Sequence, residues 1–103
     1  MRDRKVPFDS GFEDAMLGEI KTATSRTYQI GDVGDTFKAF GAIFEITQVC
    51  TAKLGDVANY NYRVEGCSST EEFIRIWKRI YRWFNPNYIV WFHRFRLVHM
   101  YAR

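Results

Sequence analysis

An amphipathic helix following residue 68 is the feature that most constrains how this chain can fold. Ser68 and Ser69 offer hydroxyl caps to the first backbone amides of a helix, and Pro86 stops it because proline cannot continue helical hydrogen bonding. Between these ends, apolar residues recur at helical spacing: Phe73, Ile76, Trp77, Ile80, Tyr81 and Phe84. A stripe of this kind must be buried against another layer of structure.

The middle and the end of the chain predict a sheet that supplies this layer. Thr36–Phe40 and Ala42–Thr51 have the composition of strands joined by a hairpin at Gly41. Tyr88–Val98 predicts a long last strand, with Val90 and Phe92 on one side and Trp91, His93 and Phe95 on the other, up to any bulge. Around Tyr60–Val64, apolar residues alternate with polar ones, which predicts a further short strand.

A second helix is expected near residues 10–18. Ser10 and Glu13 have the spacing of a capping box, and Gly18 is suited to end the helix in a left-handed conformation. The 103 residues, 17% of them aromatic, can fill one dense core. We therefore predict a single α+β domain over residues 1–103, built on a small, partly closed barrel.

Several classes of protein are disfavoured by what the chain lacks. Cys50 and Cys67 do not have the paired spacing of zinc or redox sites, and without a secretory signal they are expected to be reduced thiols of a cytoplasmic protein. His93 is expected to be a packed, hydrogen-bonded side chain rather than a ligand. With no membrane span, no glycine-rich phosphate loop and no metal motif, we expect no cofactor and no metal.

The net charge of +3 permits an anionic partner without requiring one. Part of this charge lies on the outer face of the long helix, at Arg75, Lys78, Arg79 and Arg82. Such a stripe suits either of two roles: it can follow a phosphate backbone, or it can simply solvate an exposed helix face.

A polar segment after the first helix is the best candidate for chemistry. It contains Lys21, Thr24 and Arg26 within six residues. If the backbone turns there so that the side chains converge, a desolvated lysine beside another cation has a lowered pKa and can act as a base. A threonine hydroxyl needs such a neighbour to become a nucleophile.

The order of these pieces resembles the ASCH-domain family, small relatives of the PUA-like RNA-binding barrels. Lys21-x-x-Thr24-x-Arg26 matches the family's first motif, although Gly18 stands one residue further from the lysine than usual. Gly31-Asp32 or Gly34-Asp35 matches a later dipeptide, Glu65 precedes a capped helix, and His93-x-Phe95 matches the last strand. The resemblance runs from about Phe8 to Val98. It implies a PUA-like mixed β-barrel of about five to six strands with two flanking helices.

Some small members of that family are amidohydrolases that convert N4-acetylcytidine to cytidine and acetate, and the motif order is closest to theirs. By position the resemblance implies Lys21, Thr24 and Glu65 as catalytic residues. Amide hydrolysis needs a base, a nucleophile and a proton donor to the leaving nitrogen, and we assign these roles to Lys21, Thr24 and Glu65 in that order. Arg26 either stabilises negative charge on the acyl oxygen or anchors the substrate. A water positioned by Thr24 and Glu65 is an equally good nucleophile. The predicted activity is therefore that of a metal-free amidohydrolase acting on an acylated pyrimidine nucleoside, and the chain is expected to be a monomer.

Two other functions remain open. In a non-catalytic RNA-binding module, cationic residues would contact phosphates and aromatic rings would stack on bases. The residues proposed to contact substrate or RNA are Arg26, Arg63, Arg75, Lys78, Arg79 and Arg82. In a ribonuclease, the same lysine and glutamate would act on a ribose 2′-hydroxyl.

Overall fold

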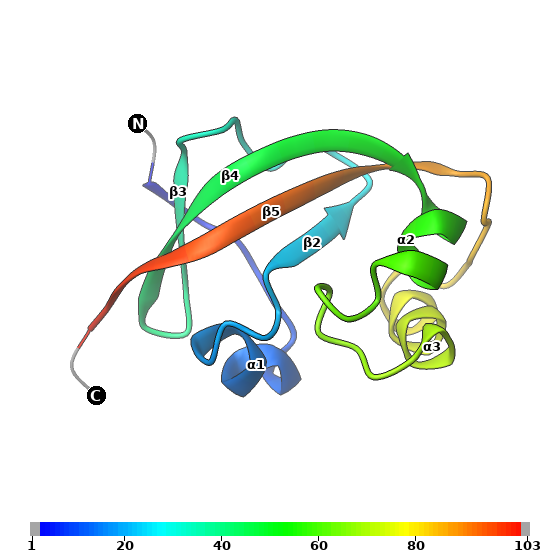
Figure 1. Ribbon diagram of the computed structural model, residues 1–103, viewed down its shortest axis with the longest axis horizontal. Coiled ribbons are helices and arrows are strands. Elements are labelled where there is room, and N and C mark those ends of the chain that lie inside the picture. Colours follow the sequence, from blue (N-terminus) through cyan, green and yellow to red (C-terminus); the bar gives the residue numbers. More distant parts are fainter. Residues whose placement is uncertain (1–2, 102–103) are drawn as a thin grey trace.

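The computed structural model describes residues 3–101 and shows a curved sheet whose two longest strands arch over the helices (Figure 1). The elements in chain order are β1 (Asp3–Lys5), the 3₁₀ helix η1 (Ser10–Phe12), α1 (Glu13–Leu17), β2 (Ala23–Arg26), β3 (Thr36–Ala39), β4 (Ala42–Lys53), α2 (Leu54–Tyr60), α3 (Thr70–Tyr81) and β5 (Ile89–Met100).

The five strands form one mixed sheet in the order β1-β3-β4-β5-β2. β1 is parallel to β3, and the other three neighbouring pairs are antiparallel. The sheet curls into a half-barrel, which confirms the predicted α+β class (Figure 1). β2 lies at one edge of the sheet, so among residues 3–101 this short strand pairs with β5 alone.

The long helix starts where its sequence predicts, but it ends at Tyr81 and not near Pro86, so Phe84 lies outside it. The Ser69 hydroxyl accepts a hydrogen bond from the Glu72 amide at 3.0 Å, as an N-cap should. The helix ends at Tyr81 because Arg82 adopts a left-handed conformation with φ of 70°. Phe73 and Trp77 carry its apolar stripe into the core.

The strand predicted around Tyr60–Val64 is wrong. The helix α2 ends at Tyr60, and turns follow it in which the Glu65 amide bonds to Asn61 O and the Cys67 amide to Tyr62 O. Tyr62 and Val64 pack against the core from these turns. Tyr60 is 79% exposed and the polar Glu65 is buried, so the alternation in the sequence does not correspond to a buried and an exposed strand face, and the Glu65 and Cys67 amides bond within the turns.

The first helix also differs from its prediction. Asp9, not Ser10, caps it by accepting the Gly11 amide at 2.8 Å, and the helix starts as a 3₁₀ turn. Gly18 has φ of −86°, and the left-handed residue is Glu19, with φ of 59°. The left-handed residue of the turn toward Lys21 is therefore Glu19, one residue closer to the lysine than Gly18, which the sequence indicated.

Two apolar clusters lie on opposite faces of the sheet at β5. Val90 and Phe92 belong to the cluster packed with α2 and α3, whereas Phe95 and Leu97 belong to the cluster that contains Met16. This alternation is the predicted one, and the register between β4 and β5 shifts near Ile46 and Gln48. Of the helices between residues 3 and 101, none combines the length and the apolar character that crossing a bilayer requires.

His93 links the edge strand to the rest of the fold. The Ile30 amide donates to its Nε2 at 3.0 Å, and its Nδ1 lies 3.2 Å from the Thr24 carbonyl oxygen. These partners suit a neutral imidazole protonated at Nδ1, and burial lowers the pKa of His93. The histidine is fully buried, as expected for a structural side chain.

Candidate active site at the edge of the sheet

A cavity of about 320 Å³ opens beside the edge strand β2. Its walls come from the segment before α1, from β2, from the turn before α3 and from α3 itself. The lining residues are Pro7, Phe8, Asp9, Phe12, Lys21, Thr24, Ser25, Arg26, Glu65, Cys67, Phe73, Ile76, Trp77, Ile80 and Tyr81. The polar members gather at β2, and the apolar members form the facing walls.

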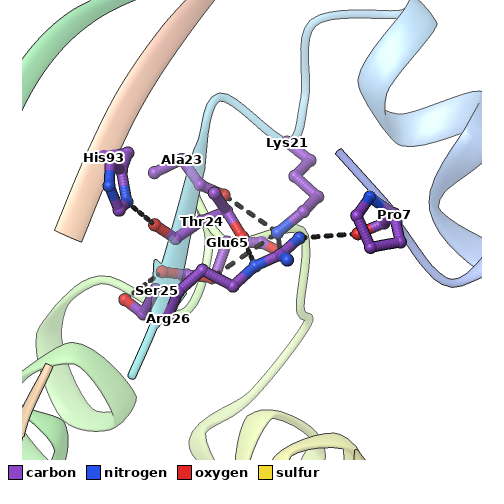
Figure 2. Close-up of polar contacts among 8 residues, drawn as sticks. All are labelled: Pro7, Lys21, Ala23, Thr24, Ser25, Arg26, Glu65 and His93. Atoms are coloured by element: carbon purple, nitrogen blue, oxygen red, sulfur yellow. Dashed lines mark hydrogen bonds and ion pairs between the residues drawn. The ribbon is translucent and has the colours of Figure 1, made fainter. Parts of the chain in front are cut away.

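Lys21 is held in this cavity by backbone and side-chain acceptors. Its amide donates to Ala15 O at 2.9 Å, which fixes the start of β2 against α1. Its ammonium Nζ donates to Ala23 O at 2.8 Å and to Glu65 O at 2.7 Å, and lies 3.5 Å from Glu65 Oε1 (Figure 2). The residue is only 3% exposed.

Burial lowers the pKa of Lys21, because a desolvated ammonium is less stable than the neutral amine. The negative charge of Glu65 acts in the opposite direction, and the positive charge of Arg26 adds to the lowering. A lysine in this setting exchanges its proton closer to neutral pH than an exposed lysine does.

Glu65 reaches the lysine from the turn that replaced the predicted strand. The Thr22 and Ala23 amides both donate to Val64 O, which ties this turn to the start of β2. The Glu65 carboxylate is buried, and its Oε2 accepts the Ser25 hydroxyl at 2.6 Å (Figure 2). Glu65 is therefore a buried partner of Lys21 rather than a surface acid.

Thr24 and Arg26 form a second polar pair in the same cavity. Arg26 Nε donates to Thr24 Oγ1 at 3.1 Å, and Arg26 Nη2 donates to Pro7 O at 2.8 Å (Figure 2). The guanidinium carbon lies 4.8 Å from the centre of the Phe8 ring. Among residues 3–101, the hydrogen bonds of Lys21 Nζ go to Ala23 and Glu65 and not to Thr24.

Aromatic rings close the cavity around these polar groups. The Phe12 ring centre lies 4.5 Å from Lys21 Nζ, which is within cation–π range. On the opposite wall, Trp77 stacks on Tyr81 with ring centres 4.2 Å apart. Burial raises the pKa of the Cys67 thiol to about 11, so this side chain is a neutral wall group at physiological pH.

The structure thus brings together four of the predicted site residues, Lys21, Thr24, Arg26 and Glu65, at one cavity. The other predicted cations are exposed and do not line it: Arg63, Arg75, Lys78, Arg79 and Arg82. Arg75 pairs with Glu72 at 3.6 Å and Arg79 with Asp9 at 2.7 Å, so part of the cationic stripe is neutralised within the fold.

The sequence reasoning missed Ser25 and the aromatic walls. Ser25 stands between Thr24 and Arg26 in the motif, and nothing in the spacing indicates that its hydroxyl meets a carboxylate 40 residues away in the chain. Phe73 and Trp77 were expected to be core side chains. They are buried, but they also line the cavity, and helical periodicity does not distinguish a core face from a cavity wall.

Gly66 is expected to be essential for the position of Lys21. Its φ is +90°, and a Cβ placed on it would lie 3.0 Å from Lys21 Cβ and 3.2 Å from Lys21 Cδ. We expect Gly66→Ala to be destabilised by about 1 kcal/mol more than a glycine-to-alanine change that meets backbone strain alone, because the methyl group must displace the lysine stem.

Gly34→Ala is the matched control for this prediction. Gly34 has φ of +93°, but a Cβ there would meet nothing within 4 Å. Denaturant unfolding of both variants measures the difference. Equal losses of stability in the two variants would show that the lysine stem is not constrained by Gly66.

Within the part of the chain that the structure describes, no three histidine, cysteine, aspartate or glutamate side chains are grouped as a metal site would need.

No protein-family model and no curated protein matches the sequence. Solved structures do match the fold. An ASCH domain from Lactobacillus crispatus JV V101 superposes with a TM-score of 0.69 at 16% identity, over 95% of this chain and 80% of that one. This chain has the ASCH-domain fold.

Two further structures share the ASCH fold of this chain. A protein of Enterococcus faecalis V583 matches with a TM-score of 0.70 and 19% identity, over 99% of this chain and 82% of that one. A protein of Pyrococcus furiosus matches with a TM-score of 0.63 and 14% identity, over 94% of this chain and 96% of that one. The ASCH fold therefore extends over nearly the whole chain, in agreement with the extent of the resemblance in sequence.

Proposed function

We propose that this ASCH domain is a metal-free amidohydrolase that removes the acetyl group from N4-acetylcytidine or a related acylated pyrimidine nucleoside. The observation that carries the proposal is the buried Lys21–Glu65 pair at one end of a cavity with aromatic walls. Burying a lysine and a carboxylate costs free energy, and proteins accept that cost most often where the groups perform chemistry.

The cavity suits a flat, small substrate. Its volume of about 320 Å³ is at the lower end of the range of small-molecule sites. The rings of Phe12 and Tyr81 offer apolar surfaces against which a pyrimidine can pack, and the polar end then receives the exocyclic amide. A single nucleoside fits this arrangement better than a long strand does.

The contacts favour water over Thr24 as the nucleophile. Thr24 Oγ1 is held by Arg26, whereas Lys21 is bound to Glu65. In the proposed reaction, a water oxygen attacks the acetyl carbon while the Lys21–Glu65 pair accepts its proton. The same pair then delivers a proton to the amide nitrogen as the C–N bond breaks, which releases cytidine and acetate. Thr24 orients the water, and Arg26 faces the negative charge that develops on the acyl oxygen.

The experiment is incubation of the purified protein with N4-acetylcytidine, followed by chromatographic measurement of cytidine and acetate. We expect turnover in the presence of EDTA at the rate seen without it. If neither N4-acetylcytidine nor other N4-acylcytidines yield cytidine, the amidohydrolase proposal is wrong. Loss of turnover in EDTA that added metal restores would contradict its metal-free form.

A specific surface feature supports RNA binding as the second candidate function. Lys78 of α3 and Arg82, directly after this helix, are exposed and form no ion pair among the described residues. Trp83 and Tyr88 follow in the chain; their rings are partly exposed and their ring centres lie 4.8 Å apart. Cations beside exposed rings suit single-stranded RNA. Binding that weakens steeply with salt, in a protein that does not deacetylate cytidine, would favour this function. Cleavage of the RNA in the same experiment would instead identify a ribonuclease.

A further inference from the structure

Both carboxylate oxygens of Glu65 have a partner: Ser25 in β2 contacts one, and Lys21, just before β2, contacts the other. Oε2 accepts the Ser25 hydroxyl at 2.6 Å, and Oε1 faces Lys21 Nζ at 3.5 Å. Ser25 is 6% exposed and Glu65 is 4% exposed, so bulk water does not compete for either contact. The serine contact is the shorter of the two and has the length of a hydrogen bond to a charged acceptor.

Ser25 approaches the carboxylate from the side of β2 that Thr24 does not use. Successive side chains of a strand point to opposite faces, and the pairing with β5 sets Thr24 beside His93 and Ser25 beside Phe92. Thr24 accordingly shares a face with Arg26, whose Nε it binds. The two adjacent hydroxyls of the motif therefore have different partners.

The serine contact removes a freedom that the glutamate otherwise keeps. The last torsion of a glutamate side chain joins an sp³ to an sp² carbon and has no sharp rotational preference. A carboxylate without a fixed partner on Oε2 rotates about this bond and presents either oxygen, or neither, to the lysine. A hydroxyl has one proton to donate, and Ser25 gives it to Oε2.

We infer that Ser25 is a positioning residue of the proposed amidohydrolase: it fixes the rotation of the Glu65 carboxylate so that Oε1 alone faces Lys21 and exchanges protons with it. The inference rests on the proposed function for its kinetic consequence. The orientation of the carboxylate also affects the pKa of Lys21, which can be measured without turnover.

The kinetic test compares Ser25→Ala, which lacks the hydroxyl, with Ser25→Thr, which retains it. We expect Ser25→Ala to lower kcat for N4-acetylcytidine about tenfold while KM stays within about twofold, since the serine acts through Glu65 and not on the substrate. Ser25→Thr should recover most of kcat. Ser10→Ala, the same change at an exposed position outside the cavity, is the control and should match the wild type.

The second test needs no substrate. The charge of Glu65 raises the pKa of Lys21 against the effect of burial, so a carboxylate free to rotate away should let this pKa fall further. Titration of the lysine Cε and Nζ resonances by NMR should therefore give a lower midpoint for Lys21 in Ser25→Ala than in the wild type or in Ser25→Thr.

The outcomes separate the inference from the proposed function. A lowered Lys21 midpoint in Ser25→Ala supports the inference even if the protein deacetylates nothing. An unchanged midpoint overturns it, as does a Ser25→Thr variant as impaired as Ser25→Ala. A loss of activity of about 10³-fold or more in both variants would also overturn it, because it would indicate that the serine itself is the nucleophile. If Ser25→Ala does not fold, the inference is judged on Ser25→Thr, which must titrate and turn over as the wild type does.

Discussion

Replacing Lys21 by methionine is expected to lower kcat for N4-acetylcytidine by about 10³-fold, the effect of removing a central acid–base group. Methionine retains an apolar stem of similar length in the space beside Gly66 and Phe12, but it has no proton to exchange with Glu65. Steady-state kinetics measure the loss. Binding of the product cytidine, measured by calorimetry, should weaken far less, because the aromatic walls remain.

Lys53→Met is the matched control for this prediction. Lys53 is exposed at the end of β4 and does not line the cavity, so the same chemical change there should leave kcat unaltered. Retention of more than about a tenth of wild-type kcat by Lys21→Met would show that Lys21 is a structural group and not part of the acid–base machinery.

Replacing Glu65 by glutamine is expected to cause the largest loss of stability. The change leaves the buried Lys21 ammonium without its counter-charge, and breaking a buried pair from one side costs about 3 kcal/mol or more at neutral pH. Equilibrium urea unfolding measures this loss. The double variant Lys21→Met/Glu65→Gln should recover part of it, since no buried charge then remains.

The pH dependence of this loss has a definite sign. Burial lowers the pKa of folded Lys21 below the unfolded value of 10.5, so the unfolded chain binds more protons in the interval between the two values. Stability therefore rises with pH across that interval. Glu65→Gln removes the charge that raises the pKa of Lys21, so the pH interval between the folded and unfolded pKa values widens. The free energy of unfolding of the variant should therefore approach that of the wild type between pH 7 and pH 10. A deficit that is constant with pH would mean that the lost stability comes from packing and not from the lysine charge.

Local patterns were sufficient to predict α3 and the long strands. The helix has its hydroxyl caps and its apolar stripe within one stretch of chain, so interactions between near neighbours define its start and its buried face, although it ends at Tyr81 and not at Pro86. The turns after α2 were predicted wrongly for the same reason. Tyr62 and Val64 alternate with polar residues, but the carbonyl oxygen of Tyr62 bonds within the turn. The carbonyl oxygen of Val64 accepts the Thr22 and Ala23 amides, a contact with a distant segment that no local pattern indicates.

In the candidate site, too, features that are local in the chain can be predicted from the sequence, whereas contacts between distant residues cannot. The sequence indicates Lys21, Thr24 and Arg26 as candidates because they lie close together in the chain and resemble a family motif. Ser25 lies among them, but its spacing does not distinguish it, because its partner Glu65 is distant in sequence and only the fold brings the two within 2.6 Å. The aromatic residues of α3 were identified as apolar, but their role as cavity walls depends on the gap beside the edge strand.

The sequence by itself determined the class of fold, the position of the main helix and strands, and the residue types available for acid–base chemistry, because these follow from periodicity, capping and composition over short stretches. Only the tertiary structure decided that Lys21 and Glu65 share a buried cavity, that Ser25 holds the carboxylate, and that two of the four cations along α3 are neutralised by Asp9 and Glu72. Desolvation, ion pairing and side-chain orientation depend on which distant segments the fold places in contact, and no local pattern encodes these distances.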